Sequence, residues 1–349
     1  MDLNEDTRPF GGAAALRFLG LLLAAVLTLW PTAAWASAPA VIPVGRAVGI
    51  KLFSDGVVVV GTSEVATESG SVNPAKACGL KEGDIITHIN STEVDTIEEV
   101  SALLQELEGR AMSIRAIRDD RQVQLTAKAA LCSTDGSYKL GAWIRDSMAG
   151  IGTVTFYDPA TGAFGALGHG INDADTALLM PLDSGSILPA TVAGVEKGKP
   201  GDPGQLQGVF DTDSTLGLLS ANTDGGVFGV LSDSAWAQGT PVETALRDEV
   251  EAGDATILCN ISGDRVEEFA IRIEKVFSPR ADDCRDYLIK VTDQRLLDAT
   301  GGIVQGMSGS PILQNGKIVG AVTHVLVDDP TSGYGIYVGR MLDQCEYHL

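Results

Sequence analysis

Hydrophobic residues follow two different patterns along the chain. One uninterrupted apolar stretch covers residues 18–36, whereas the later hydrophobic runs are short and end at Gly, Pro or Asp. Runs such as GIGTVTFYD, EEFAIRIEKVF and KIVGAVTHVLV are rich in β-branched residues or alternate apolar with polar positions. These features are typical of β-strands joined by turns. The pattern therefore predicts a mainly β protein after residue 38.

Residues 39–130 are expected to form a small unit of their own. Its first part, 47–61, is predicted to be two strands around a Ser-Asp-Gly turn. The segment 95–109 places Ile, Val and Leu on one helical stripe, with Asp95 as the expected N-cap and Gly109 as the helix end. A hairpin of alternating apolar residues follows and closes the unit.

The remainder, 131–349, contains many short β-type runs and a single expected helix near 243–250. A segment of this length with such punctuation indicates a β-barrel or double-barrel domain.

The apolar stretch at 18–36 has the character of an export signal or a membrane anchor. Arg8 and Arg17 precede it, and AWASA at 34–38 offers Ala-x-Ala cleavage sites. The stretch is also nearly as long as the ~20 residues that a membrane-spanning helix needs. We therefore expect residues 1–38 to direct or anchor the rest of the chain outside the cytoplasm.

Charge and cysteine spacing exclude several classes of function. The net charge is −21 and no basic run occurs, which argues against nucleic-acid binding because phosphates require clustered Lys and Arg. The five cysteines are at least 25 residues apart, so the chain has no zinc-ligand spacing. TGGIVQG lacks the Gly-Lys-Ser/Thr end of a phosphate loop. No metal or cofactor is expected.

The stretch GMSGSP at 306–311 carries the strongest chemical signal. It fits the Gly-x-Ser-Gly-[Gly/Ser]-Pro turn that holds the nucleophile of trypsin-like serine proteases. The glycines permit a tight turn that aims backbone N–H groups at a developing oxyanion. We expect Ser308 to be the nucleophile and the N–H groups of Gly306 and Ser308 to form the oxyanion hole. Asn315-Gly316 then predicts a tight β-hairpin after the turn.

A serine nucleophile needs a base and a group that orients it. Four histidines occur: His88, His169, His324 and His348. His169, between glycines at a strand end, is the preferred base, with His324 as the rival that strand position makes a packed or surface residue. Among carboxylates, Asp173, Asp175 and Asp293 remain open, since each taken singly is a common turn or cap residue.

Two parts of the chain resemble known families. GLKEGDIITHIN, with the elements around it, resembles a PDZ domain of the bacterial protease type. That resemblance implies that Val48, Gly49 and Ile50 form the carboxylate-binding loop. A peptide C-terminus would then add to the neighbouring strand through backbone hydrogen bonds.

Longer stretches resemble the stage IV sporulation protein B family of serine peptidases. They include FYDPATGAFGALGHGINDADT and the block from 291 to 325. The resemblance implies an N-terminal membrane segment, a PDZ domain at 39–130 and a trypsin-like double-barrel peptidase domain at 131–349. It implies His169, Asp293 and Ser308 as the triad and Thr323 as support, although Asp293 lies unusually close to Ser308 in the sequence.

The family role implied is that of a sporulation signalling protease outside the forespore membrane. Such a protease cleaves itself, here near 37–47, and then cuts a membrane-bound inhibitor complex so that a late sigma factor is activated. A general quality-control protease with broad substrates and an inactive PDZ binding protein are the alternatives. Complete Ser, His and Asp candidates disfavour the inactive protein.

Overall fold

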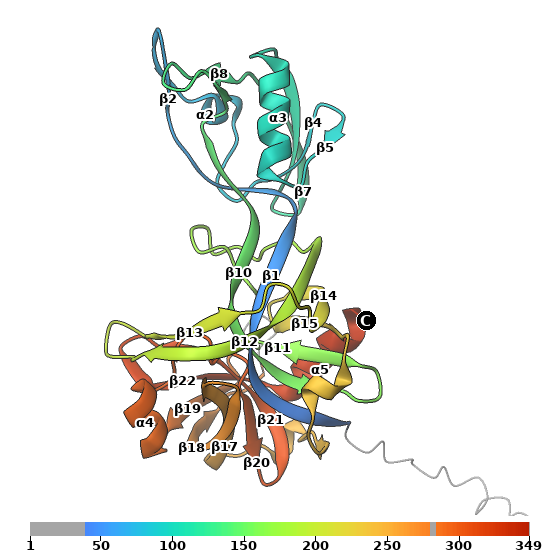
Figure 1. The fold of residues 1–349 in the computed structure, drawn as a ribbon, viewed down its shortest axis with the longest axis vertical. Coiled ribbons are helices and arrows are strands. Elements are labelled where there is room, and N and C mark those ends of the chain that lie inside the picture. Colours follow the sequence, from blue (N-terminus) through green and yellow to red (C-terminus); the bar gives the residue numbers. More distant parts are fainter. Residues whose placement is uncertain (1–38, 280–283, 349) are drawn as a thin grey trace, which may run out of the picture. The chain divides into compact units, whose positions relative to one another are not determined.

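The structure is a computed structural model that describes residues 39–279 and 284–348. The apolar stretch at 18–36 lies outside these residues, so its expected role as signal or anchor remains a prediction. Among the described residues, no helix has the length and apolar character needed to cross a membrane. Residues 39–349 form one compact unit, and most of it is strand (Figure 1).

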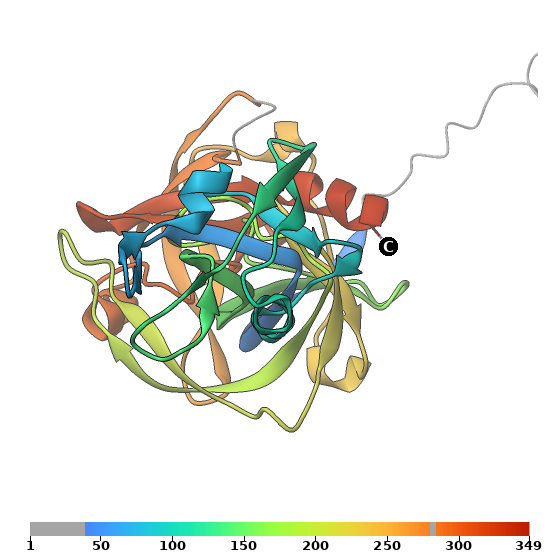
Figure 2. The same cartoon turned by 90° about the horizontal axis from the view of Figure 1, so that it is seen from above.

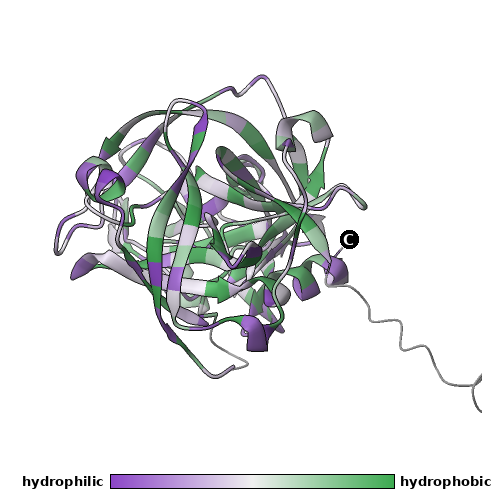
Figure 3. Cartoon of the chain, turned by 90° about the horizontal axis from the view of Figure 1, so that it is seen from below, coloured by the Kyte–Doolittle hydropathy of each residue, from purple (hydrophilic) through white to green (hydrophobic). Residues whose placement is uncertain are grey.

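A closed barrel of six strands forms the C-terminal half of the peptidase domain. Around the ring the strands are β17 (Gly253–Ser262), β18 (Arg265–Val276), β19 (Tyr287–Val291), β22 (Asp329–Tyr337), β21 (Lys317–Leu326) and β20 (Pro311–Gln314). In β18 the side chains of Phe269, Ile271 and Ile273 are buried inside, while the intervening positions are exposed. This is the alternation expected of a barrel wall, and Figure 3 shows it as alternating hydropathy along the strands.

A second ring of six strands forms the other half. Its strands are β1 (Ala40–Thr62), β10 (Ala142–Tyr157), β11 (Ala163–Ala166), β15 (Gly226–Leu231), β14 (Gly217–Thr223) and β12 (Ser184–Glu196). The ring closes because β12 also pairs with β1, from Val48↔Pro189 to Phe53↔Ser184. Strand β13 (Gln205–Phe210) extends β12. The mainly β, double-barrel fold predicted from the sequence is confirmed, and the two rings can be followed by colour in Figures 1 and 2.

Short helices and turns complete the peptidase domain. They are the 3₁₀ turns η1 (Ser234–Ala237) and η2 (Arg247–Glu249) and the helices α4 (Gln294–Thr300) and α5 (Val338–His348), together with the short strand β16 (Val242–Glu243), which pairs with β1. The prediction of a helix near 243–250 is therefore wrong, since only the single 3₁₀ turn η2 occurs there. The hairpin predicted at Asn315-Gly316 is confirmed, with positive φ at both residues joining β20 to β21.

The PDZ unit is built around a small sheet, a short helix and a longer one. It contains α2 (Pro74–Cys78), β4 (Ile85–Ile89), β5 (Thr92–Glu93), α3 (Ile97–Leu107), β6 (Met112–Arg118) and β7 (Arg121–Ala127), with the short ribbons β2 (Val65–Thr67), β3 (Gly70–Val72), β8 (Ala130–Leu131) and β9 (Tyr138–Lys139). Helix α3 is capped by Thr96 in a capping box with Glu99 rather than by Asp95. Asp95 instead accepts a hydrogen bond from the N–H of Gly56.

Strands β1 and β10 are shared between the two units. The first part of β1, up to Phe53, pairs with β12 and with the end of β10 in the barrel. Its last residues, 57–62, pair with β4 and with the start of β10 in the PDZ sheet. The chain thus contributes a barrel strand before it forms the PDZ unit and returns to the barrel through β10.

Candidate active site

The turn that carries Ser308 is held by the opposite barrel. Gly306 and Gly309 have φ of +96° and +95°, a region that favours glycine. A Cβ on Gly309 would lie 2.0 Å from the carbonyl oxygen of Thr153 in β10. The N–H of Thr153 donates to the Ser308 carbonyl at 3.0 Å, and its hydroxyl donates to the Gly306 carbonyl at 2.8 Å. Gly309 is therefore favoured by close approach as well as by φ, and Gly306 by its φ.

The backbone N–H groups expected to form an oxyanion hole are left available. Those of Met307, Gly309 and Ser310 donate to carbonyls of Val304, Val322 and Met307. Within residues 39–279 and 284–348, the N–H groups of Gly306 and Ser308 donate to no other group of the chain. Two free donors beside a serine are the arrangement that stabilises a tetrahedral intermediate.

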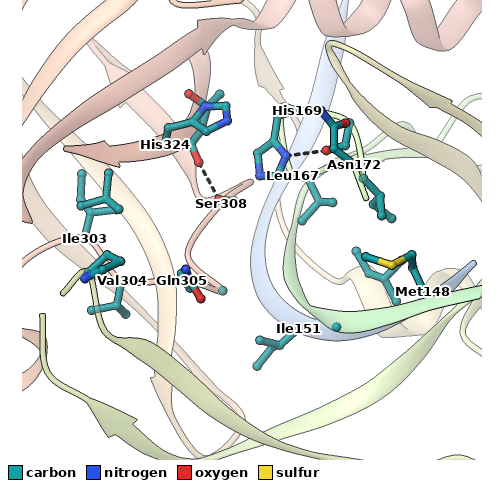
Figure 4. A pocket seen from close by; sticks show the side chains of 18 of the residues that line it. Met148, Ile151, Leu167, His169, Asn172, Ile303, Val304, Gln305, Ser308 and His324 are labelled. Carbon is teal, nitrogen blue, oxygen red and sulfur yellow. Dashed lines mark hydrogen bonds between the residues drawn. The ribbon is translucent and has the colours of Figure 1, made fainter. Parts of the chain in front are cut away.

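His169 follows strand β11 and shares a pocket with Ser308 (Figure 4). Its Nδ1 lies 2.8 Å from the carbonyl oxygen of Gly170. Because a carbonyl only accepts, the hydrogen bond places the proton on Nδ1 and leaves Nε2 as the basic nitrogen. Burial lowers the pKa of His169 below its ordinary value, against the opposing effect of the Gly170 carbonyl. The imidazole is therefore neutral and basic at neutral pH.

The Ser308 hydroxyl is not directed at His169. Its Oγ donates to the carbonyl oxygen of Thr323 at 2.6 Å. Thr323 thus contacts the nucleophile through its backbone, whereas its own hydroxyl is buried without a hydrogen-bond partner in the described chain. The Ser308 hydroxyl must leave the Thr323 carbonyl before its proton can pass to the imidazole.

His324 is exposed, which agrees with the expected surface position, but it also lines the pocket that holds Ser308 and His169. Its ring centroid is 4.8 Å from that of His169, with an interplanar angle of 38°. Figure 4 shows both rings above Ser308. A protonated His324 would disfavour protonation of its neighbour, because two like charges would then lie close together.

The structure does not bring Asp293 to His169. Asp293 is the N-cap of helix α4, and its carboxylate accepts hydrogen bonds from Ala270 N–H and from the backbone and side chain of Arg295. The Arg295 guanidinium is the main cause that lowers its pKa to about 2. The role expected of Asp293 as the group that orients His169 is thus not seen in this arrangement, since both oxygens are engaged elsewhere.

The carboxylates near His169 in the sequence are also engaged. Asp173 is buried, pairs with Arg145 and accepts from the backbone of Asp175 and Thr176. Asp175 is exposed and binds the same guanidinium. Among the described residues, no carboxylate forms a hydrogen bond with His169. The Gly170 carbonyl occupies the place that a carboxylate would take.

Val48, Gly49 and Ile50 do not form a carboxylate-binding loop. They lie in the barrel part of β1, paired with β10 on one side and β12 on the other, so their backbone groups are already used. In the PDZ unit, β9, which contains Tyr138, and the start of β10 both contact helix α3. Gln105 of α3 exchanges two hydrogen bonds with Tyr138, and Asp146 accepts from the N–H of Ile97 at the other helix end. Within the described chain, residues 142–147 have a strand partner on one edge only.

The pocket between Ser308 and His169 is mostly apolar. Its volume is about 430 Å³, and no Asp, Glu, Lys or Arg lines it. Ile303 and Val304 lie on one side of Ser308 in Figure 4, Val325 also lines the pocket, and Met148 and Ile151 come from β10. No group of His, Cys, Asp and Glu within the described residues could hold a metal ion. The five cysteines are free thiols.

Comparisons with known proteins identify both parts of the chain. The model of the family described as SpoIVB peptidase S55 matches residues 136–342, and a PDZ domain model matches residues 71–118. No curated protein matches the chain.

Solved structures give only distant likenesses. The PDZ domain of the SdrC-like protein from Listeria monocytogenes is 23% identical, covering 26% of this chain and 87% of its own, with a TM-score of 0.21. The active form of the Rv3671c protease from M. tuberculosis is 15% identical, covering 58% and 75%, with a TM-score of 0.33. The HtrA-type protease AlgW with a decapeptide is 12% identical, covering 62% and 55%, with a TM-score of 0.34.

Proposed function

The chain belongs to the SpoIVB peptidase S55 family and carries a PDZ domain, and on this premise we propose that it is a signalling endopeptidase of sporulation. It cleaves itself and then a membrane-bound inhibitor complex, which leads to activation of a late sigma factor. The observation that carries the proposal is the placement of Ser308 and His169, from opposite barrels, in one apolar pocket.

The proposed reaction begins with rotation of Ser308 from the Thr323 carbonyl to Nε2 of His169. As Oγ attacks the scissile carbonyl carbon, its proton passes to Nε2, and the N–H groups of Gly306 and Ser308 bind the oxyanion. When the intermediate collapses, the C–N bond breaks and His169 returns the proton to the leaving amine. Water then repeats the sequence on the acyl-enzyme and releases the acid.

The chemistry of the pocket supports a preference for apolar residues around the scissile bond. Burying a charged side chain against Ile303, Val304 and Val325 would cost desolvation energy without a partner. An apolar side chain there would instead contribute ~25 cal/mol for each Å² it buries. A requirement for apolar residues at the cleavage site suits a protease that cuts its target at few positions.

The proposed setting follows from the N-terminal sequence. Residues 1–38 export or anchor the chain, so the enzyme acts outside the forespore membrane, between the two membranes of the developing spore. Self-cleavage at the start of the expected segment 37–47, before Ala40, separates the folded unit from the membrane segment, because from Ala40 on the segment belongs to barrel strand β1 and is largely buried. The PDZ unit binds a peptide C-terminus and restrains or directs the enzyme.

The experiment compares signalling with bulk proteolysis. In the organism that encodes the chain, Ser308→Ala is expected to abolish expression of a mother-cell reporter that depends on the late sigma factor. The purified parent is expected to release its own N-terminal segment but to leave casein intact. Rapid casein digestion together with an unaffected reporter would instead identify a quality-control protease.

A further inference from the structure

The peptide group between Gly170 and Ile171 forms two hydrogen bonds, one through its carbonyl oxygen and one through its N–H. Its carbonyl oxygen accepts from Nδ1 of His169 at 2.8 Å. Its N–H donates to Oδ1 of Asn222 at 2.8 Å. Since the carbonyl and the N–H belong to one planar unit, the orientation of this plane sets the direction in which the imidazole is held.

Asn222 fixes that plane from the neighbouring strand. It lies near the end of β14, and its Nδ2 also donates to the carbonyl oxygens of Ile171 and Met180, both at 2.9 Å. All three hydrogen bonds of this side chain therefore go to the loop that starts at His169. A Cβ on Gly170 would lie 2.8 Å from the carbonyl oxygen of Thr223, so the loop is also packed directly on the strand.

We propose that Asn222 is a positioning residue of the peptidase and acts on His169 through the Gly170–Ile171 peptide. The proposal rests on the proposed function, since it concerns the base of the same reaction. An acceptor at the N–H polarises the amide and makes its carbonyl a better acceptor for Nδ1–H. The relay thus keeps Nε2 unprotonated and aimed at Ser308, which is the work that a carboxylate does in other serine proteases.

The amide is better suited to this position than a carboxylate would be. Oδ1 faces one donor, whereas Nδ2 faces two carbonyl oxygens. An ionised aspartate would keep the first contact but would direct its second oxygen, which only accepts, at those two carbonyls. Only a protonated aspartic acid could reproduce one of the two lost bonds.

The test uses the full chain and three variants: Asn222→Ala, Asn222→Asp and the matched control Asn260→Ala. Asn260 is a buried asparagine whose Nδ2 also donates to backbone carbonyls, those of Ser262, Gly263 and Arg265, in a turn of the other barrel. For each protein we would measure the rate of fluorophosphonate labelling of Ser308 against pH, the melting temperature, and the imidazole ¹⁵N shifts of His169.

Asn222→Ala is expected to lower the labelling rate by about 10²-fold, in line with the cost of a misplaced catalytic group, and to mix the two tautomers of His169. Asn222→Asp is expected to label faster at acidic pH than Asn222→Ala and to lose this advantage as pH rises and the carboxyl ionises. Asn260→Ala should lose stability while its labelling rate and His169 shifts stay those of the parent.

If Asn222→Ala loses only melting temperature, with parental rate and shifts, the positioning role is wrong while the serine peptidase assignment stands. A parent that takes up no probe would instead refute the proposed function. The ¹⁵N shifts still decide the positioning claim in that case, because a single Nδ1–H tautomer that survives Asn222→Ala contradicts it.

Discussion

At the scale of residues, the nucleophile and the base of the site each form a hydrogen bond with a backbone carbonyl. The Ser308 hydroxyl is held by the Thr323 carbonyl, while His169 is held by the Gly170 carbonyl and faces His324. A net hydrogen bond is worth about 1 kcal/mol, so a bound substrate that fills the pocket could release Ser308 with little cost.

Substitutions of Asp293 can show whether its carboxylate caps helix α4 or orients His169. Asparagine caps helices as well as aspartate does, and the exposed partner Arg295 contributes at most ~1 kcal/mol. We expect Asp293→Asn to label at Ser308 within a few-fold of the parent, and Asp293→Ala to lose about 1 kcal/mol of stability with its cap. Labelling rate and urea unfolding check this. A loss near 10⁴-fold in Asp293→Asn would show that the carboxylate orients the imidazole.

The sequence predicts those site residues that a short local motif marks. The glycines at 306 and 309 reflect the positive φ that the turn requires, so the motif itself points to Ser308. Asn222 has no such signal, because its contacts with Ile171 join positions 51 residues apart across the barrel. The place of Asp293 could not be derived either, since the sequence alone does not distinguish an aspartate that caps a helix from one that orients a histidine.

At the scale of elements, strand β1 differs most from what the sequence predicts. Its sequence was expected to form two strands around a Ser-Asp-Gly turn, which is wrong, because Ala40–Thr62 is one continuous strand that serves two units. Residues 48–53 pair with β12, which lies more than a hundred positions later in the chain. Such long-range pairing leaves no trace in local alternation, and this explains why Val48, Gly49 and Ile50 were expected in the PDZ unit.

The shared strand predicts which fragments fold. A chain of residues 131–349 lacks the strand Ala40–Phe53 and therefore leaves the N-terminal barrel open, so it should show no cooperative thermal transition. Phe53 pairs with Ser147, so replacing 55–144 by a short turn should keep both barrels closed and retain Arg145, the partner of buried Asp173. That shortened protein is expected to melt cooperatively and to label at Ser308.

Calorimetry and probe labelling of the two fragments check this expectation. Cooperative melting of 131–349 by itself, with labelled Ser308, would contradict the structural role of β1. Failure of the shortened protein alone would instead show that the PDZ unit stabilises the barrels.

At the scale of the whole molecule, three observations together indicate a serine peptidase. The closed double barrel places Ser308 and His169 at a common pocket, the PDZ unit is joined to it through β1 and β10, and the family match covers residues 136–342. The enzyme class follows from these together, whereas the sporulation role and the membrane setting depend on the family proposal.

The most direct measurement is the pH dependence of fluorophosphonate labelling of residues 39–349, with Ser308→Ala and His169→Ala in parallel. Because burial lowers the pKa of His169, the base is present at neutral pH and is lost only below the ordinary histidine value of about 6.5. The account predicts labelling at Ser308 alone, with a rate that rises with pH through a midpoint below that value, and no such labelling in either variant. Labelling that persists in Ser308→Ala, or a parent that stays unlabelled at every pH, would contradict it.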